Sequence, residues 1–275
     1  MPELPEVETI ARGLERRVRD DVVESVWIGR KPQPLKSPAR EITKTLAGAR
    51  IAKVRRLGKH IVFELADGPA GGGRAARAQW VVHLGMTGRL VLADPAEPRA
   101  PHTHAVLRLR SGRELRFVDP RRFGKLRVVR GAGFETPGEE PLGVGFDKFV
   151  ALFRGRQAPI KSALLNQKLL RGLGNIYADE SLFRARVRPR RRAHRLSGEE
   201  MRRLYDSIQQ VLSQAIAAGG SSISDYVDAS GEAGMFQFEH RVYGREGEPC
   251  VVCRTPIKRV VIAGRSAHYC PKCQV

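Results

Sequence analysis

Apolar residues follow two different periodicities along the chain. Near the start, one set recurs every three or four positions: Val7, Ile10, Leu14 and Val18. This spacing predicts an amphipathic helix. A second helix is predicted after Ser197, which forms a capping-box pattern with Glu200 and is followed by apolar residues at helical spacing up to Ile216. Gly219 and Gly220 end this helix. Met201 and Tyr205 on its apolar face are interpreted as core residues.

Between these two regions, short apolar segments alternate with turn residues. Strands are predicted over 22–28, 51–57, 60–65, 79–84, 90–92, 105–109, 114–118 and 126–129. Many short strands separated by turn signals are typical of a β-sandwich or barrel. The glycine-rich stretch that starts at Gly68 lacks the Lys-Ser/Thr of a phosphate-binding loop, so we interpret it as a plain hairpin loop. A Gly/Pro/Glu-rich stretch over 131–145 indicates a linker.

The four cysteines form two pairs near the end of the chain. Cys250 and Cys253 are separated by two residues, as are Cys270 and Cys273, and sixteen residues lie between the pairs. This spacing predicts one structural Zn²⁺ held by four thiolates, with no open position for chemistry. Two disulfides are the alternative, but four cysteines in 275 residues are too few for a disulfide-dense secreted protein. Between the pairs, residues 260–262 are predicted as a strand of a hairpin that presents Arg265 to a phosphate.

The net charge narrows the choice of partner. A formal charge of +20 and a pI near 10.7 favour a polyanion such as DNA. The sequence has no run of eighteen apolar residues and no Lys-rich amphipathic helix, so we predict no membrane association and a cytoplasmic location. An arginine-rich run over 184–195 is either a phosphate-binding or a merely solvated face. The turn Gly172–Asn175 is predicted to enter a helix whose free amides suit a phosphate, with Asn175 as an alternative helix cap.

The first residues carry the candidate chemistry. If Met1 is removed, Pro2 presents a secondary amine, which can attack a sugar carbon and form an iminium. Its α-amino group titrates near neutral pH, so part of it is unprotonated. Glu3 is adjacent and Glu6 lies one helical turn further on, and such carboxylates can relay protons. The alternative is that Pro-Glu only opens a helix.

Several motifs together resemble one family. They are Pro2-Glu-Leu-Pro-Glu-Val-Glu-Thr9, Arg56-Leu-Gly-Lys59, His83-Leu-Gly-Met86-Thr-Gly88, Asp119-Pro-Arg-Arg-Phe-Gly124, Gly172-Leu-Gly-Asn-Ile-Tyr-Ala-Asp-Glu180, Val242-Tyr-Gly-Arg245 and the zinc segment 264–274. The chain resembles formamidopyrimidine-DNA glycosylases, bacterial enzymes that remove oxidised purines from DNA. The sister family, endonuclease VIII, acts on oxidised pyrimidines and has Gly where this chain has Leu4.

The resemblance implies an α+β multidomain fold. We predict an N-terminal β-sandwich with flanking helices over 1–134, a linker over 135–148, a helix–two-turns–helix domain with a lesion-capping loop over 149–238, and a zinc-finger β-hairpin over 239–275. The implied partner is double-stranded DNA that contains an oxidised purine or an abasic site, bound by a monomer. DNA is expected to cross between the two lobes.

The resemblance also implies residue roles. Pro2 resembles the nucleophile, Glu3 the proton donor, Lys59 the lysine that assists β-elimination and Arg265 the zinc-finger arginine of δ-elimination, with Glu6 in support. A further set matches residues that bind the DNA backbone: His102, Arg121, Arg156 and Asn175. Met86, Arg121 and Phe123 match the trio that fills the gap left by an extruded base, which requires an exposed ledge rather than a core position.

Departures from the family pattern bear on detail. Arg254 stands where Gly is usual, so we expect an altered zinc-knuckle turn. Ser224 and Met235 replace a basic residue and a Tyr in the lesion-capping loop, which affects base preference. A non-catalytic zinc-containing DNA-binding protein is the rival interpretation, in which the charge matters and Pro2 does not.

Overall fold

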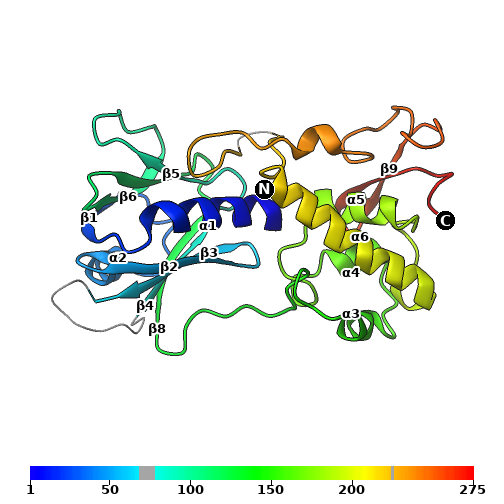
Figure 1. The fold of residues 1–275 in the computed structure, drawn as a ribbon, viewed down its shortest axis with the longest axis horizontal. Coiled ribbons are helices and arrows are strands. Elements are labelled where there is room, and N and C mark those ends of the chain that lie inside the picture. Colours follow the sequence, from blue (N-terminus) through cyan, green and yellow to red (C-terminus); the bar gives the residue numbers. More distant parts are fainter. Residues whose placement is uncertain (68–77, 224–225) are drawn as a thin grey trace. The chain divides into compact units, whose positions relative to one another are not determined.

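A computed structural model describes the fold of residues 1–67, 78–223 and 226–275 (Figure 1). It divides into two compact units: unit 1 comprises Met1–Glu135 and Gly219–Met235, and unit 2 comprises Thr136–Ala218 and Phe236–Val275. The predicted hairpin loop that starts at Gly68, and Ser224, lie outside the described residues. The predicted boundaries of the four segments stay predictions.

Unit 1 is built on two four-stranded antiparallel sheets. The first has the order β1 (Val23–Ile28), β6 (Thr103–Leu109), β7 (Glu114–Val118), β5 (Arg89–Ala93). The second has the order β2 (Arg50–Leu57), β3 (His60–Ala66), β4 (Ala78–His83), β8 (Lys125–Arg130). Buried side chains from both sheets, such as Trp80 and Phe117, share one core, as a sandwich requires. The predicted strands are confirmed, with ends that differ by at most two residues.

Two helices flank these sheets. Helix α1 (Leu4–Val18) buries the predicted apolar face, and Val7 and Leu14 are fully inaccessible to solvent. Helix α2 (Ala39–Leu46) was not predicted, because only Ile42 and Leu46 mark its buried face. Two apolar positions in eight residues are too few for a clear periodic signal.

The segment Gly219–Met235 packs onto unit 1 although it follows a helix of unit 2. Ala229 is buried in the sandwich core, and Leu92 donates a backbone hydrogen bond of 3.1 Å to the Ala229 carbonyl. This packing joins a segment that resembles a lesion-capping loop to the unit that carries Pro2.

Unit 2 contains four α-helices and a β-hairpin. They are α3 (Phe146–Phe153), α4 (Ile160–Leu164), α5 (Asn175–Arg184), α6 (Gly198–Ala217), β9 (Lys258–Ile262) and β10 (Arg265–Tyr269). The predicted capping box is confirmed, since Ser197 Oγ accepts the Glu200 N–H at 3.2 Å and the Ser197 N–H reaches the Glu200 carboxylate at 2.8 Å. Among the described helices of both units, each is too short or too polar to cross a bilayer.

Candidate active site

Pro2 directly precedes Glu3, the N-cap residue of α1. The helix opens with a capping box: the Glu3 carboxylate accepts the Glu6 N–H, and the Glu3 N–H donates to Glu6 Oε2 at 2.8 Å. Pro2 is buried, and Glu3 is only 4% exposed. The backbone of Glu3, the residue after Pro2, is therefore fixed by hydrogen bonds to Glu6. Pro-Glu does open a helix, and the catalytic roles of Pro2 and Glu3 stay predictions.

Glu6 links α1 to the segment that resembles the lesion-capping loop. Its Oε1 atom accepts the Ser221 N–H at 2.8 Å, while Oε2 accepts the Glu3 N–H. Gly220, with φ of +84°, lies so close that a Cβ atom there would be 2.8 Å from Glu6 Oε1. The Tyr226 hydroxyl donates to the Gly219 carbonyl at 3.0 Å. One buried carboxylate thus fixes both the start of α1 and the start of this segment.

Lys59 lies in the tight turn between β2 and β3. The turn contains Gly58, with φ of +56°, and is braced by Arg56. Arg56 donates to the Gly58 carbonyl at 3.1 Å and forms an ion pair of 2.7 Å with Glu8 of α1. The side chain of Arg56 is 9% exposed, so this pair is largely shielded from water. It connects the helix that starts with Pro2 to the turn that carries Lys59.

Two histidines lie close to Lys59. The rings of His60 and His83 are 4.9 Å apart. Burial lowers the pKa of His60 to about 4 and that of His83 to about 3, and the Lys59 charge contributes to the second shift. Both rings are therefore neutral at pH 7. His83 Nδ1 accepts the Gly85 N–H at 3.0 Å, which holds the turn that precedes Met86.

The predicted gap-filling residues are exposed on two turns of unit 1. Met86 is 41% and Phe123 is 51% exposed, which agrees with an exposed ledge. Arg121 stacks on Phe123, with its guanidinium carbon 4.9 Å from the ring centroid. His102, another predicted DNA contact, is exposed at a left-handed position with φ of +64°.

Unit 2 holds the remaining predicted phosphate contacts. Asn175 is the first residue of α5, and Gly174 rather than Asn175 occupies the cap position, so the alternative cap assignment for Asn175 is wrong. The Asn175 side-chain nitrogen donates instead to Ser266 Oγ at 3.2 Å, while its Oδ1 atom is buried without a hydrogen bond. Arg265, at the start of β10, precedes Ser266 and is exposed. The structure therefore brings Asn175 to the start of strand β10, which begins at Arg265.

Arg156 follows α3 and is exposed. Its Nε atom donates to the Leu152 carbonyl at 2.5 Å, and its own carbonyl contacts His194 Nδ1 at 2.9 Å. These contacts hold the backbone of Arg156 near α3. They involve neither Asn175 nor Arg265.

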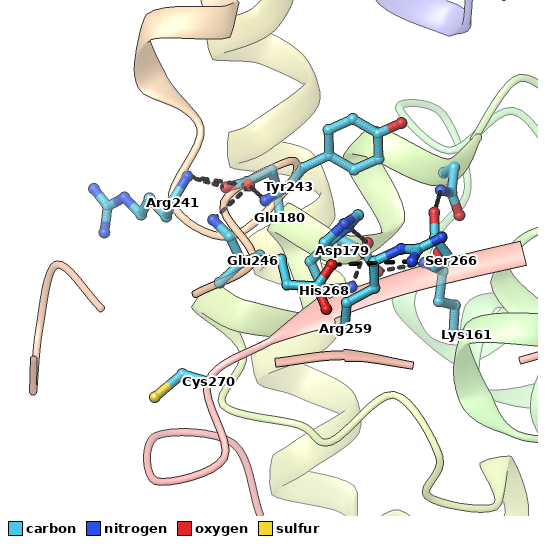
Figure 2. A network of polar contacts seen from close by, with 12 residues as sticks. Lys161, Asp179, Glu180, Arg241, Tyr243, Glu246, Arg259, Ser266, His268 and Cys270 are labelled. Carbon is cyan, nitrogen blue, oxygen red and sulfur yellow. Dashed lines mark hydrogen bonds and ion pairs between the residues drawn. The ribbon is translucent and has the colours of Figure 1, made fainter. Parts of the chain in front are cut away.

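A buried ion pair joins α4, α5 and the hairpin (Figure 2). Lys161 and Asp179 are both fully buried, with 2.5 Å between Lys161 Nζ and Asp179 Oδ1. Lys161 also donates to the Ser266 carbonyl, and Asp179 Oδ2 accepts the His268 N–H at 2.9 Å. The pair therefore holds the backbone of β10 on both sides of Ala267, next to Arg265. Sequence reasoning missed Lys161, because lysine is almost always exposed and no neighbouring residue indicates its buried partner Asp179.

Glu180 provides a second buried anchor in the same unit. It accepts the backbone N–H groups of Arg241, Val242 and Tyr243 at 2.9–3.1 Å, as Figure 2 shows in part. Burial raises the pKa of Glu180, and the hydrogen bonds from the three backbone N–H groups oppose that rise. The contact fixes the segment that leads into the zinc hairpin.

The four cysteines are close enough to share one ion. Their sulfur atoms all lie within 4.8 Å of one another, with 3.9 Å between Cys250 and Cys273 and 3.4 Å between Cys253 and Cys270. A tetrahedral zinc site with Zn–S bonds of about 2.3 Å needs sulfur atoms about 3.8 Å apart. The geometry and the donor set fit one structural zinc, as predicted. Arg254 adopts φ of +65° beside the first pair, so Arg takes up the left-handed conformation that Gly adopts more easily.

Comparisons with known proteins cover the chain. Three family models match the chain. The N-terminal domain of formamidopyrimidine-DNA glycosylases matches residues 1–126, and the H2TH domain of the same enzymes matches residues 138–227. A zinc finger found in FPG and IleRS matches residues 247–275. Formamidopyrimidine-DNA glycosylases of Solibacter usitatus and Gluconobacter oxydans are 46% and 43% identical over the whole chain and 99–100% of their own length.

Solved structures agree with this assignment. The MutM (FPG) protein of Thermus thermophilus has a TM-score of 0.85 at 43% identity, with 99% of this chain and 98% of that chain covered. A Lactococcus lactis FPG mutant in complex with DNA has a TM-score of 0.88 at 33% identity, with 99% of each chain covered. The three domain models and the full-length identity lead to one conclusion. The chain belongs to the formamidopyrimidine-DNA glycosylase family.

Proposed function

We propose that this protein is a base-excision-repair glycosylase that removes oxidised purines from duplex DNA and cleaves the resulting abasic site. Its Lactococcus lactis relative was solved with DNA that contains Fapy-dG and with DNA that contains an abasic site. The observation that carries the proposal is the head of α1, where Pro2 directly precedes a buried and hydrogen-bonded Glu3. A cytoplasmic location follows from the substrate, because chromosomal DNA of bacteria lies there.

Pro2 acts as the nucleophile after Met1 is removed. Its secondary amine bonds to C1′ of the damaged nucleotide while the bond between C1′ and the base breaks, and the electron pair leaves with the base. Glu3 donates a proton to the ring oxygen as the sugar opens, which leaves an iminium between Pro2 and C1′. Loss of a C2′ proton then expels the 3′ phosphate, and a second proton loss expels the 5′ phosphate. Water hydrolyses the remaining iminium and frees Pro2.

The other predicted residues bind and shape the DNA. Lys59 and Arg265 assist the two eliminations from positions near the backbone phosphates. Four polar or basic residues contact the backbone: His102, Arg121, Arg156 and Asn175. Met86 and Phe123 enter the stack and Arg121 takes the place of the extruded base, which limits the cost of unstacking. The zinc ion supplies folding energy to the hairpin and takes no part in the chemistry.

Borohydride trapping tests the nucleophile. The full-length, zinc-loaded protein is mixed with duplex DNA that contains a lesion or an abasic site, and borohydride reduces any iminium to a stable amine. We expect a trapped complex whose sugar fragment is attached to the Pro2 nitrogen by mass spectrometry. Attachment to Lys59 or another lysine would contradict the assignment of Pro2. The complete absence of a trapped complex would favour a non-catalytic DNA-binding protein.

Glu3→Gln is the matched variant for the proton donor. It keeps the amine and nearly the same volume but removes the acid. We expect base excision to fall by roughly 10²–10⁴-fold, while trapping on a preformed abasic site falls less. An equal loss on both substrates would argue that Glu3 only supports the helix cap.

Oxidised pyrimidines are a second candidate substrate class, because a Lactococcus lactis FPG structure also contains DNA with an oxidised pyrimidine. Single-turnover excision from matched duplexes that carry either an oxidised purine or an oxidised pyrimidine separates the two. A faster reaction on the purine lesion supports the proposed function. The reverse order would assign the protein to pyrimidine repair.

A further inference from the structure

Two turns of unit 1 lie against each other although they are far apart in sequence. One joins β4 to β5 and carries Met86, and the other joins β7 to β8 and carries Arg121 and Phe123. Their backbones are in direct contact at Gly85, where a Cβ atom would lie 2.5 Å from Gly124 N. Gly85 also has φ of +65°, so a side chain is excluded there on two grounds.

One buried carboxylate holds both turns. Asp119 is fully buried, and its Oδ1 atom accepts the Thr87 hydroxyl at 2.7 Å while its Oδ2 atom accepts the Gly124 N–H at 2.7 Å. The Arg121 N–H adds a longer contact of 3.4 Å to Thr87 Oγ1. Each oxygen of Asp119 therefore binds a different turn. Charge-assisted hydrogen bonds of this kind are stronger than those between neutral groups.

Asp119 also ties these turns to the His102 loop. The Asp119 N–H donates to the His102 carbonyl at 3.0 Å, and His104 Nε2 lies 2.9 Å from the Asp119 carbonyl. Backbone and side chain of a single residue thus contact three segments that carry proposed DNA contacts. Asp119 itself is inaccessible to solvent and so has no direct route to DNA.

We propose that Asp119 and Thr87 are positioning residues that hold the two turns together as one preformed wedge for duplex DNA. The inference rests on the proposed function, in which Met86, Arg121 and Phe123 fill the gap left by the extruded base. A wedge that is ordered before it meets DNA loses little conformational freedom when it inserts. Two turns that move separately must be ordered during extrusion, which slows that step.

We call the hydrogen bonds of Asp119 to Thr87 and Gly124 the clamp. Thr87→Val tests it, because valine lacks the hydroxyl and keeps the shape of threonine. Thr87→Ser is the matched control that keeps the hydroxyl. Single-turnover base excision is measured on a duplex with an oxidised purine opposite cytosine, with 2-aminopurine beside the lesion to report unstacking. Cleavage of a single-stranded abasic oligonucleotide is measured in parallel, because no partner strand has to be wedged there. Asp119→Asn, which retains one acceptor oxygen, serves as a second and milder variant.

We expect Thr87→Val to slow both excision and the 2-aminopurine signal on the duplex by roughly ten- to a hundredfold. Cleavage of the single strand should stay within about twofold of wild type. Thr87→Ser should excise the base from the duplex at the wild-type rate. The rate of Asp119→Asn should lie between those of Thr87→Ser and Thr87→Val. In a Met86→Ala background, Thr87→Val should slow duplex excision much less, because the Met86 side chain that Thr87 positions is absent.

Three results would overturn the clamp: duplex excision by Thr87→Val at the wild-type rate, an equal loss on both substrates, or a full loss in the Met86→Ala background. The proposed function fails separately, if the wild-type protein neither excises the base nor forms a trapped complex, and the clamp then falls with it.

Discussion

In unit 1 the proposed gap-filling side chains stand on turns between strands, whereas in unit 2 Asn175 stands on the first turn of α5 and Arg265 on a hairpin next to a metal site. Asp119 holds the turns of unit 1 through neutral donors, the Thr87 hydroxyl and the Gly124 N–H. Lys161 and Asp179 hold the hairpin of unit 2 through a fully buried ion pair. The turns that carry Met86 and Phe123 each join one sheet of the sandwich to the other, β4 to β5 and β7 to β8, so strand pairing alone does not place them. Strands β9 and β10 pair with each other, and residues of α4 and α5 anchor them to the rest of unit 2.

The buried ion pair of unit 2 and the hydrogen bonds of Asp119 in unit 1 should differ in how much folding stability is lost when one partner is removed. Removing one partner of a buried ion pair leaves a charge in a medium that solvates it poorly. Removing one neutral donor from a carboxylate that keeps another donor leaves a smaller deficit. The folding stability of unit 2 should therefore depend strongly on its metal and on its buried pair, and loss of one hydrogen bond to Asp119 should cost unit 1 less folding stability.

Loss of the metal should give the largest difference in stability between the two units. Cys250→Ser removes one thiolate ligand, and structural zinc contributes on the order of 10 kcal/mol to the folding of small zinc modules. We expect β9 and β10 to lose their protection against hydrogen exchange and DNA cleavage to fall steeply, while the strands of unit 1 keep their protection. Val252→Ser, at an exposed position of the same knuckle, is the control and should retain zinc. One zinc per chain together with full activity in Cys250→Ser would refute the prediction.

Lys161→Met should cause the next largest loss of folding stability. It leaves the Asp179 carboxylate buried without its cation, which typically costs about 3–5 kcal/mol. Lys148→Met is the matched control in the same unit, because Lys148 forms a 2.8 Å ion pair with Glu139 but its side chain is 62% exposed. An exposed pair of this kind should contribute less than about 1 kcal/mol. Denaturant unfolding measures both, and equal losses would show that burial of the Lys161 pair has no special cost.

Acidification should lower the folding stability of both units through buried histidines. Burial lowers the pKa of His60 and His83 in unit 1, and it lowers the pKa of His240 in unit 2 to about 4. Between pH 6.5 and about 4 the unfolded chain binds protons that the folded chain does not, so stability is lost as the pH falls. Each histidine should cost about 1–2 kcal/mol between pH 7 and pH 5. His60→Gln and His240→Gln should each remove one such contribution from the free energy of unfolding, and unchanged pH dependence in both would refute this.

The smallest predicted effect concerns backbone strain. Arg254 in unit 2 and Arg122 in unit 1 have φ of +65° and +57°, values that glycine adopts more easily. Arg254→Gly should stabilise the zinc hairpin by about 0.5–1 kcal/mol, measured as slower hydrogen exchange in β9 and β10. Arg259→Gly, within strand β9, is the control and should destabilise the same hairpin. Stabilisation by both variants would point to relief of charge repulsion instead of strain.

Much of the architecture could be predicted because its signals are local. The strands of unit 1 and helices α1 and α6 follow from apolar spacing, turn residues and the Ser197 capping box, and each signal lies within a few residues of its effect. The zinc site follows from cysteine spacing. Helix α2 escaped prediction, because only Ile42 and Leu46 mark its buried face.

The amino-acid sequence by itself determined the periodic elements, the four-cysteine site and the identity of the candidates Pro2, Met86 and Phe123. Only the tertiary structure decided which groups hold them. Glu6 meets Ser221, Asp119 meets Thr87, and Lys161 meets Asp179 and Ser266 across separations of 18 to 215 residues. A buried polar residue is stable only where its partners converge on it, and no pattern of neighbouring residues records which distant donor or acceptor will satisfy it.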